Sequence, residues 1–367
     1  MITLLLMTIT KSTAIRAAVR KFIVLMALLS FTASNTMAQR EIRFGVLGLF
    51  HPQELLLEPE SKNILSVMED GIPNHGSQVL NGESGHREII FRAEGDRVIA
   101  GSRIANSWSV GARDGGAVAF RVTVPGRIHR AYWGRLTVAA HQGELLAVVA
   151  MDGETAVASI VAAEMVENAP IEALKAQAVA TRSFLSAGSR HNDFDFCDTT
   201  HCQFLKSPPL PNSGAVHAVQ ATRGLILAYR GKPLAAMYSS RCGGKTRSLR
   251  DAGMEPGEAY PYYAVPCARC IKHPFTWKSR IGPNARVPYP GNEAKRIAQA
   301  RQWGWSAIPG SDFNATADVD GWHLEGHSIG HGVGMCQYGA VGMALDGATF
   351  REILSHYYPN TMLISLP

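Results

Sequence analysis

The chain has 367 residues, of which 46% are hydrophobic and 18% charged, and its formal net charge is +6. This composition describes a globular protein with a substantial core and excludes an intrinsically disordered one. The length fits one large domain or two ordinary ones. No Lys/Arg-rich run appears beyond the N-terminus, so the sequence does not indicate a nucleic-acid-binding protein.

Residues 1–38 have the pattern of a secretory signal peptide. Four basic residues precede an apolar stretch, residues 22–31, which is too short to span a bilayer, and a small-x-small cleavage site follows at residues 36–38. Without residues 1–38 the chain keeps 32 basic and 30 acidic residues, a net charge of +2. We expect an exported, nearly neutral mature protein, in a periplasm or outside the cell, with no stable membrane span.

Residues 39–150 consist of short, β-branched and often alternating segments separated by Gly, Asp and Asn. They predict a β-rich N-terminal module, arranged as a meander or a barrel-like sheet. No catalytic constellation is visible in this part of the chain.

Residues 151–367 have a mixed character. Segment 159–188 repeats apolar residues at helical spacing, and Pro170 suits the first turn of a helix. Strands return at residues 224–240, where Arg230 and Gly231 predict a hairpin turn. Residues 251–320 are rich in Gly, Pro and Trp and are expected to be irregular. Near the C-terminus, Thr349 and Glu352 match a capping box. The sequence therefore predicts an α+β fold.

The stretch GHSIGHGVGMCQYGAVGMA, residues 326–344, places two histidines four residues apart. A zinc-peptidase helix uses this spacing, but it also needs a glutamate directly after the first histidine, which His327 lacks. The surrounding glycines each cost a helix interior about 1 kcal/mol. We predict a tight glycine loop that either packs as structure or lines a substrate cleft.

The six cysteines are Cys197, Cys202, Cys242, Cys267, Cys270 and Cys336. In an exported protein an even number suggests disulfides, while the close pairs 197/202 and 267/270 also fit metal ligation. His191, Cys197 and Cys202, with His201 beside the second cysteine, suit Zn²⁺ with an open fourth position. A Cys197–Cys202 disulfide is the alternative. For the CxxC pair, a Cys242–Cys267 disulfide, a redox pair and a second metal site all remain open.

Three segments are familiar as an ordered set: IVAAEM with PIEALKAQAVATRSF, then YSSRCGGKTRS, then GHGVGMCQYGAVGMALDGATFREILSHYYPNT. They resemble the signature blocks of the SpoIID/LytB family, which comprises stage II sporulation protein D and the amidase-enhancer proteins. The resemblance covers about residues 120–365. To the signal peptide (1–38) and the β-rich module (39–150) it adds a third part, a mixed α/β catalytic domain with a substrate cleft (151–367).

The resemblance implies an exported lytic transglycosylase that cuts peptidoglycan glycan strands and leaves 1,6-anhydro-muramyl ends, with a preference for strands whose peptides an amidase has removed. The matching catalytic acid is Glu164. Its apolar neighbours would raise its pKa and keep a proton available near neutral pH. One carboxyl suffices because the sugar's own C6 hydroxyl attacks, whereas a hydrolase usually needs two. The alternative for Glu164 is an ordinary exposed helix glutamate.

Other positions that match the family blocks are candidates for substrate binding. Gln177 and Arg182 could orient Glu164, contact sugar or hold the helix to the sheet, and His331 matches a family histidine whereas His327 does not. The candidate set is Gln177, Arg182, Ser239, Ser240, Gly243, Gly244, His331 and Gln337. Trp277, Trp303, Trp305 and Trp322 could stack on sugars, although most fit a core better. Cys336 stands where the family often has Ser, and we assign it no role.

Some members of the family bind zinc through a histidine and two cysteines in the matching loop, which implies a structural zinc at His191, Cys197 and Cys202. No organic cofactor is implied. The implied partners are glycan strands and a cell-wall amidase. Two competing functions remain open: a non-catalytic glycan-binding enhancer of an amidase, and a zinc amidase that acts on peptide stems. The products distinguish them, since the three functions give anhydro-sugar ends, no new ends or freed peptides.

Overall fold

The computed structural model describes residues 40–60, 63–70, 78–81, 88–254, 260–282 and 288–366, with residues 78–81 described by backbone alone. The expected signal peptide lies outside these ranges. The described residues belong to one compact unit. Within these ranges, no helix has the length and apolar character needed to cross a membrane.

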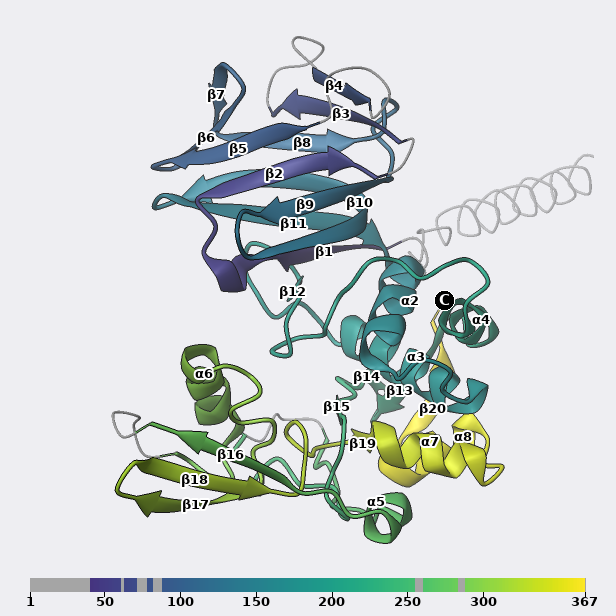
Figure 1. The fold of residues 1–367 in the computed structure, drawn as a ribbon. Helices are drawn as coiled ribbons and strands as arrows, with labels where there is room; N and C mark the ends of the chain where they lie inside the picture. Colours follow the sequence, from purple (N-terminus) through teal and green to yellow (C-terminus); the bar gives the residue numbers. More distant parts are fainter. Residues whose placement is uncertain are drawn as a thin grey trace, which may run out of the picture. The chain divides into compact units, whose positions relative to one another are not determined.

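The N-terminal part of the described chain is built from strands, as predicted (Figure 1). The sheet has the strand order β12-β1-β11-β10-β9-β2-β5-β6-β7, in which the edge strand β12 (Phe196–Cys197) comes from later in the chain. Strand β8 pairs with β10 and with β3, and β3 pairs with β4. The strands are β1 (Glu41–Val46), β2 (Glu54–Pro59), β3 (Ile64–Glu69), β4 (Gln78–Asn81), β5 (Ile89–Glu94), β6 (Arg97–Ala100), β7 (Arg103–Ala105), β8 (Ser107–Gly111), β9 (Val118–Val124), β10 (Ile128–His141) and β11 (Glu144–Asp152). A short 3₁₀ helix, Gly48–Phe50, follows β1.

The longest strand, β10, connects two portions of this sheet. Its first half, from Ile128 to Gly134, pairs with β9. Its second half pairs with β8 on one side and β11 on the other. Gly134 has a φ of 152°, and a Cβ there would overlap the carbonyl oxygen of Ala150. Glycine is therefore required where β10 changes partners. Along β9, buried and part-buried residues alternate, as expected for a strand with one face on a core.

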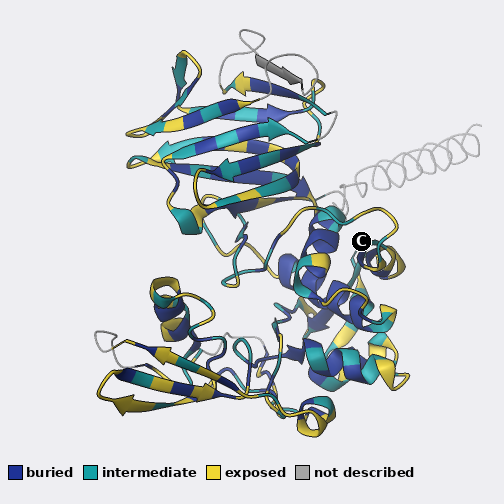
Figure 2. Cartoon of the chain, in the orientation of Figure 1, coloured by how far each residue is buried: buried dark blue, intermediate teal, exposed yellow. Residues whose placement is uncertain are grey.

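The following part is mostly helical and centres on α3 (Ile171–Ser186), which contacts α2, α4, α7, α8 and β13. From Ala173 to Leu185 nearly every residue of α3 is buried (Figure 2). The surrounding elements are α2 (Gly153–Glu164), β12 (Phe196–Cys197), α4 (Gly214–Ala221), β13 (Leu225–Tyr229), β14 (Lys232–Pro233), β15 (Tyr238–Ser239), β19 (Met335–Cys336), α7 (Gln337–Leu345), α8 (Phe350–Tyr357) and β20 (Met362–Ser365).

Several local predictions for this part are confirmed. Arg230 and Gly231 form the turn between β13 and β14, with φ of 50° and 77°. Thr349 and Glu352 form the capping box of α8. Pro170 is the N-cap of α3 and lies one residue before the first turn in which the sequence placed it. The α+β class is confirmed as well.

The expectation that residues 251–320 are irregular was wrong in part. This stretch contains α5 (Ala268–Lys272), β16 (Trp277–Ile281), α6 (Glu293–Trp303) and β17 (Phe313–Asp318), and β18 (Gly321–Gly326) follows it directly. Strands β16, β18 and β17 form an antiparallel sheet in that order, over a small core that includes Trp277 and Phe313. The pattern was weak because much of this sheet is exposed, so its strands lack a clear apolar alternation.

Candidate active site and metal centre

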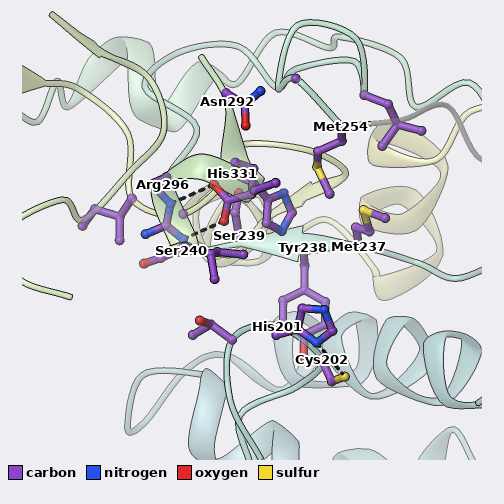
Figure 3. Close-up of a pocket in the computed structure, with 18 of the residues that line it drawn as sticks. His201, Cys202, Met237, Tyr238, Ser239, Ser240, Met254, Asn292, Arg296 and His331 are labelled. Carbon is purple, nitrogen blue, oxygen red and sulfur yellow. Dashed lines mark hydrogen bonds and ion pairs between the residues drawn. The ribbon is translucent and has the colours of Figure 1, made fainter. Parts of the chain in front are cut away.

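A cavity of about 1330 Å³ lies among residues from α2, the 190–204 loop, β15, α6 and the glycine loop. Six of the predicted site residues line it: Glu164, Cys202, Ser239, Ser240, His331 and Gln337. Figure 3 shows His201 and Cys202 beside Tyr238 on one side, and His331 near Arg296 and Asn292 on the other. The volume is ample for several sugar units or a comparable polar chain.

Glu164 is the last residue of α2 and is half-buried at this cavity. The backbone N–H of Phe204 donates to its Oε1 at 2.9 Å, and Gln337 also bonds to its carboxyl group. Burial raises the pKa of Glu164, because desolvation disfavours the charged form, while the bonds from Phe204 and Gln337 and the charge of Lys206 oppose that rise. The carboxyl is therefore held in place with its proton retained more strongly than in water.

A chain of polar side chains holds Gln337 against α3. Nε2 of Gln337 donates to Oε1 of Gln177 at 3.4 Å, and Nε2 of Gln177 donates to the hydroxyl of Thr181 at 3.2 Å. Tyr238 donates its hydroxyl to Oε1 of Gln203 at 2.9 Å. Gln177 is fully buried and absent from the cavity wall, so it acts on Glu164 through Gln337.

Glu293 supplies a second carboxylate to the described cavity wall, and this carboxylate forms an ion pair with Arg296. Arg296, one turn along α6, donates to both of its oxygens at 2.8 and 2.6 Å. Both side chains are almost completely buried. Such a buried bidentate pair occupies both carboxylate oxygens of Glu293. Among the described acidic residues lining the cavity, Glu164 is thus the one without a cationic partner in contact.

His331 and the Ser239–Ser240 turn supply further polar groups. The N–H of Val333 donates to Nδ1 of His331 at 3.0 Å, which leaves the hydrogen of the neutral ring on Nε2. Burial lowers the pKa of His331, so the neutral ring prevails. The hydroxyl oxygen of Ser239 is buried at the cavity without a hydrogen-bond partner. A ligand group there would satisfy it.

The predicted glycine loop is confirmed for the first half of the stretch, whereas Gln337–Leu345 form helix α7. Residues 327–334 contain no helix, and Gly330, Gly332 and Gly334 have φ of 88°, 75° and 72°. His327 is exposed and bonds to Thr276, away from the cavity wall that contains His331. The two histidines therefore do not form the metal pair that their spacing first suggests.

Besides Gln177, three more predicted substrate-binding residues lie outside the cavity wall. Arg182 is fully buried and donates to both oxygens of Glu154 at 2.8 and 2.7 Å, and it also donates to the carbonyl of Leu225. It connects α3 to α2 and β13. Gly243 and Gly244 have positive φ of 76° and 124°, and Gly243 packs against His327 whereas Gly244 faces Ile271. Their positions are structural in this fold.

The predicted zinc ligands do converge, and the structure adds His201 to them. One ligand atom from each of His191, Cys197, His201 and Cys202 lies within 4.8 Å of all the others. Sγ of Cys202 is 3.2 Å from Nε2 of His191 and 3.5 Å from Nδ1 of His201. Two thiols and two imidazoles match a closed tetrahedral Zn²⁺ site. This cluster, which we call the His/Cys cluster, fits a metal ion.

The loop that carries the His/Cys cluster is tied to the β-rich part. Strand β12 pairs in parallel with β1, placing Cys197 opposite Gly45. Next to it, Oδ2 of Asp198 accepts from Arg130 at 2.8 Å and from the N–H of Leu47 at 3.2 Å. These contacts fix the stretch that ends at Phe204, whose N–H reaches Glu164.

Sequence reasoning missed several groups at this site. The sequence-based ligand set has three members and leaves the fourth position to water or substrate, although His201 lies beside Cys202 in the chain. The N–H of Phe204, Tyr238 and the Glu293–Arg296 pair carried no recognisable signal. Glu293 and Arg296 are three residues apart on a helix, which predicts an ion pair but not its burial.

Comparisons with known proteins agree with this architecture. Residues 141–229 match the family described as stage II sporulation protein, SpoIID. The chain is 30% identical over 262 residues to an uncharacterized protein of Brachyspira hyodysenteriae, covering 62% of this chain and 70% of that protein. It is 29% identical to stage II sporulation protein D of Bacillus subtilis, covering 57% and 74%.

A shorter match, 44% identical over 48 residues, joins this chain to the amidase enhancer of Bacillus subtilis, covering 13% of this chain and 7% of that protein. The fold and the site define an α+β protein with an acid-bearing cleft. The chain belongs to the SpoIID/LytB family, whose members act on the bacterial cell wall.

Proposed function

We propose that this protein is a peptidoglycan lytic transglycosylase with Glu164 as its single acid/base. The observation that carries the proposal is the setting of Glu164: a desolvated carboxyl at a large cavity, with a raised pKa and no cation in contact. A carboxylic acid that lies in a cleft and has a perturbed pKa is a candidate catalytic group.

The chemistry needs one proton donor beside the glycosidic oxygen. Glu164 protonates that oxygen, the bond to C1 of the muramyl sugar breaks, and the carboxylate then takes the proton of the C6 hydroxyl as this oxygen attacks C1. The product carries a 1,6-anhydro ring, and the reaction consumes no water. The N–H of Phe204 and the amide of Gln337 stabilise the carboxylate between the two steps.

The absence of a second free acid from the described cavity wall favours this reaction over hydrolysis. Inverting and retaining hydrolases both use a pair of carboxyl groups. Glu293 is held by Arg296 and is poorly suited to act as a base or nucleophile.

The remaining polar groups of the wall would bind the glycan. Ser239, Ser240 and the Nε2–H of His331 offer hydrogen bonds to sugar hydroxyls and amides. Trp305 also lines the cavity and offers a face for a sugar ring, whereas Trp277 is buried in the small core. We propose strands without stem peptides as the preferred substrate.

The His/Cys cluster would hold Zn²⁺ through His191, Cys197, His201 and Cys202. With four protein ligands the ion supplies a cross-link and leaves no position for water. Its role is to fix the loop that presents the N–H of Phe204 to Glu164. We also propose that residues 1–38 direct export, which places the protein at the cell wall.

Mass spectrometry of digested glycan tests the activity. Purified peptidoglycan, with and without prior amidase treatment, is incubated with the wild type, with Glu164→Gln and with Glu167→Gln. Glu167 is an exposed carboxyl three residues away and serves as the matched control. We expect anhydro-muramyl ends, more from the treated substrate, that disappear in Glu164→Gln alone.

Other products would contradict the proposal. Reducing ends would indicate hydrolysis, and freed peptides would indicate an amidase. Glycan binding without any new ends would favour the enhancer function, which the short match to the amidase enhancer supports.

A further inference from the structure

A second candidate metal site consists of four cysteines and shares no residue with the His/Cys cluster. The Sγ atoms of Cys242, Cys267, Cys270 and Cys336 all lie within 4.8 Å of one another. All four residues are buried. They come from separate segments: the turn after β15, the N-cap and body of α5, and the junction of β19 with α7. We call them the four-cysteine cluster.

We propose that the four-cysteine cluster binds a structural Zn²⁺ ion with four thiolate ligands. Zinc bound by four cysteines is tetrahedral with Zn–S bonds of about 2.3 Å, which places the sulfur atoms about 3.8 Å apart. The Sγ atoms of Cys270 and Cys336 are 3.7 Å apart. A disulfide would bring two of them to about 2.0 Å. All four cysteines are free thiols here.

The ligand pattern is that of a closed structural site. Cys267 and Cys270 form a CxxC pair on one short helix, a spacing common in zinc sites. The other two ligands flank this pair at a distance in the sequence, Cys242 before it and Cys336 after it. An iron–sulfur cluster would hold its thiolates farther apart, because each binds a different iron atom of a cubane. Four protein ligands leave no position for a reacting water.

The surroundings of the four-cysteine cluster supply donors to thiolates. The N–H of Gly339 donates to Sγ of Cys336 at 3.3 Å, and the hydroxyl of Tyr357 donates to Sγ of Cys267 at 3.5 Å. Cys336 is also the N-cap of α7, where the helix dipole favours negative charge. Such donors to ligand sulfur are the usual supports of metal–thiolate sites.

Two arginines are adjacent in the sequence to ligands of the four-cysteine cluster. Arg241 and Arg269 each precede a ligand in the sequence, and their guanidinium groups lie 3.7 and 5.2 Å from the ring of Tyr338. Nε of Arg269 is buried and has no hydrogen-bond partner. A Cβ at Gly339 would overlap Sγ of Cys267, so the packing around the sulfur atoms requires glycine there.

The position of the four-cysteine cluster connects it to the cavity. Cys336 pairs with Ser239 across β15 and β19, and Gln337 follows it directly. Zinc at this point would hold together Ser239 and Gln337, the groups that face the substrate and Glu164. The ion is therefore expected to stabilise the cleft without taking part in bond cleavage.

Metal analysis of the purified protein tests this site separately from the proposed activity. Zinc per chain is measured by mass spectrometry for the wild type, for Cys270→Ser and for Cys202→Ser, which alters the His/Cys cluster and serves as the matched control. We expect Cys270→Ser to lose one equivalent of zinc relative to the wild type, and Cys202→Ser to retain the equivalent held by the four-cysteine cluster. An unchanged zinc content in Cys270→Ser, or iron in place of zinc, would overturn the assignment.

A second measurement covers the case in which Cys270→Ser does not fold. Cobalt is exchanged into Cys202→Ser, which leaves the four-cysteine cluster intact, and thiols are counted in denaturant with chelator and no reductant. We expect the charge-transfer and ligand-field bands of tetrahedral four-thiolate cobalt, and five free thiols. Disulfides, seen as two or four missing thiols, or the lack of these bands would overturn the proposal.

Discussion

The backbone N–H of Phe204 donates a 2.9 Å hydrogen bond to Oε1 of Glu164. This bond joins the end of α2 to a later loop that is itself fixed by β12 and the His/Cys cluster. The candidate acid is thus oriented by backbone whose position depends on distant contacts. Its chemistry therefore depends on how well that loop is held.

The activity should depend on pH through Glu164, and Gln337 should determine the pH at which the activity falls. Only the protonated form of Glu164 can donate a proton to the glycosidic oxygen. The value of kcat/KM should therefore fall as pH rises through the raised pKa of Glu164. Gln337 bonds to the charged form and lowers this pKa. Gln337→Met should therefore move the alkaline limb of the kcat/KM profile to higher pH. Gln302→Met, at an exposed position on α6, is the control, and a limb that stays in place would contradict the role of Gln337.

Replacing the acid should stabilise the fold at neutral pH. Because the pKa of Glu164 is raised on folding, its protonated form favours the folded state at low pH, and this contribution is lost as pH rises through the folded pKa. Glu164→Gln should gain about 0.5–2 kcal/mol in free energy of unfolding at neutral pH. The gain should vanish below about pH 4.3, the unfolded pKa of Glu.

Urea titrations at several pH values measure this difference, with Glu167→Gln as the exposed control. A gain that is independent of pH would show that the carboxyl is not desolvated as described.

Arg182 should matter for stability and not for sugar binding. Its removal leaves Glu154 buried without a partner, and breaking such a pair costs about 3–5 kcal/mol. Arg182→Met should show this loss in urea unfolding, and adding Glu154→Leu should recover much of it. Arg92→Met, in the exposed pair with Glu54, should cost less than about 1 kcal/mol. Lost activity at unchanged stability would instead place Arg182 at the substrate.

Two glycines with left-handed backbones should respond differently to alanine. At Gly334 a Cβ would overlap the carbonyl oxygen of Met237, whereas at Gly347 nothing lies within 4 Å. Their φ angles are 72° and 92°. Gly347→Ala should cost about 1 kcal/mol from backbone strain alone. Gly334→Ala adds overpacking and should cost about 3 kcal/mol. Equal losses in urea unfolding would contradict the close approach at the glycine loop.

His201 should prove to be a ligand of the His/Cys cluster. His201→Ala should weaken zinc binding at this cluster, and His217→Ala, at an exposed position on α4, should not. Removal of the ion should also lower kcat, because the loop bearing Phe204 loses its cross-link. Competition with a chelator of known affinity measures the first effect. Equal zinc affinity in His201→Ala and wild type would restrict the ligands to the three that the sequence suggested.

Much of the local structure was readable from the sequence. The Arg230–Gly231 turn and the Thr349–Glu352 capping box depend on neighbours within a few residues, and both were predicted correctly. The glycine loop was predicted correctly for residues 327–334, but the prediction missed the helix that follows at Gln337–Leu345. The sheet of β16–β18 was not, because its exposed strands carry little apolar pattern. Arg182 was ambiguous in the sequence because its partner, Glu154, belongs to the preceding helix and lies beyond the range of any local pattern.

The sequence by itself determined the family, the α+β class and the candidate acid, since ordered motifs and helical or alternating periodicity are properties of the chain alone. The tertiary structure decided which side chains share a space. It separated His327 from His331, placed the N–H of Phe204 on Glu164 and added His201 to one cluster. It also brought Cys336, for which the sequence suggested no role, to three cysteines that are distant in the chain. Long-range packing sets these distances, and no local pattern encodes them.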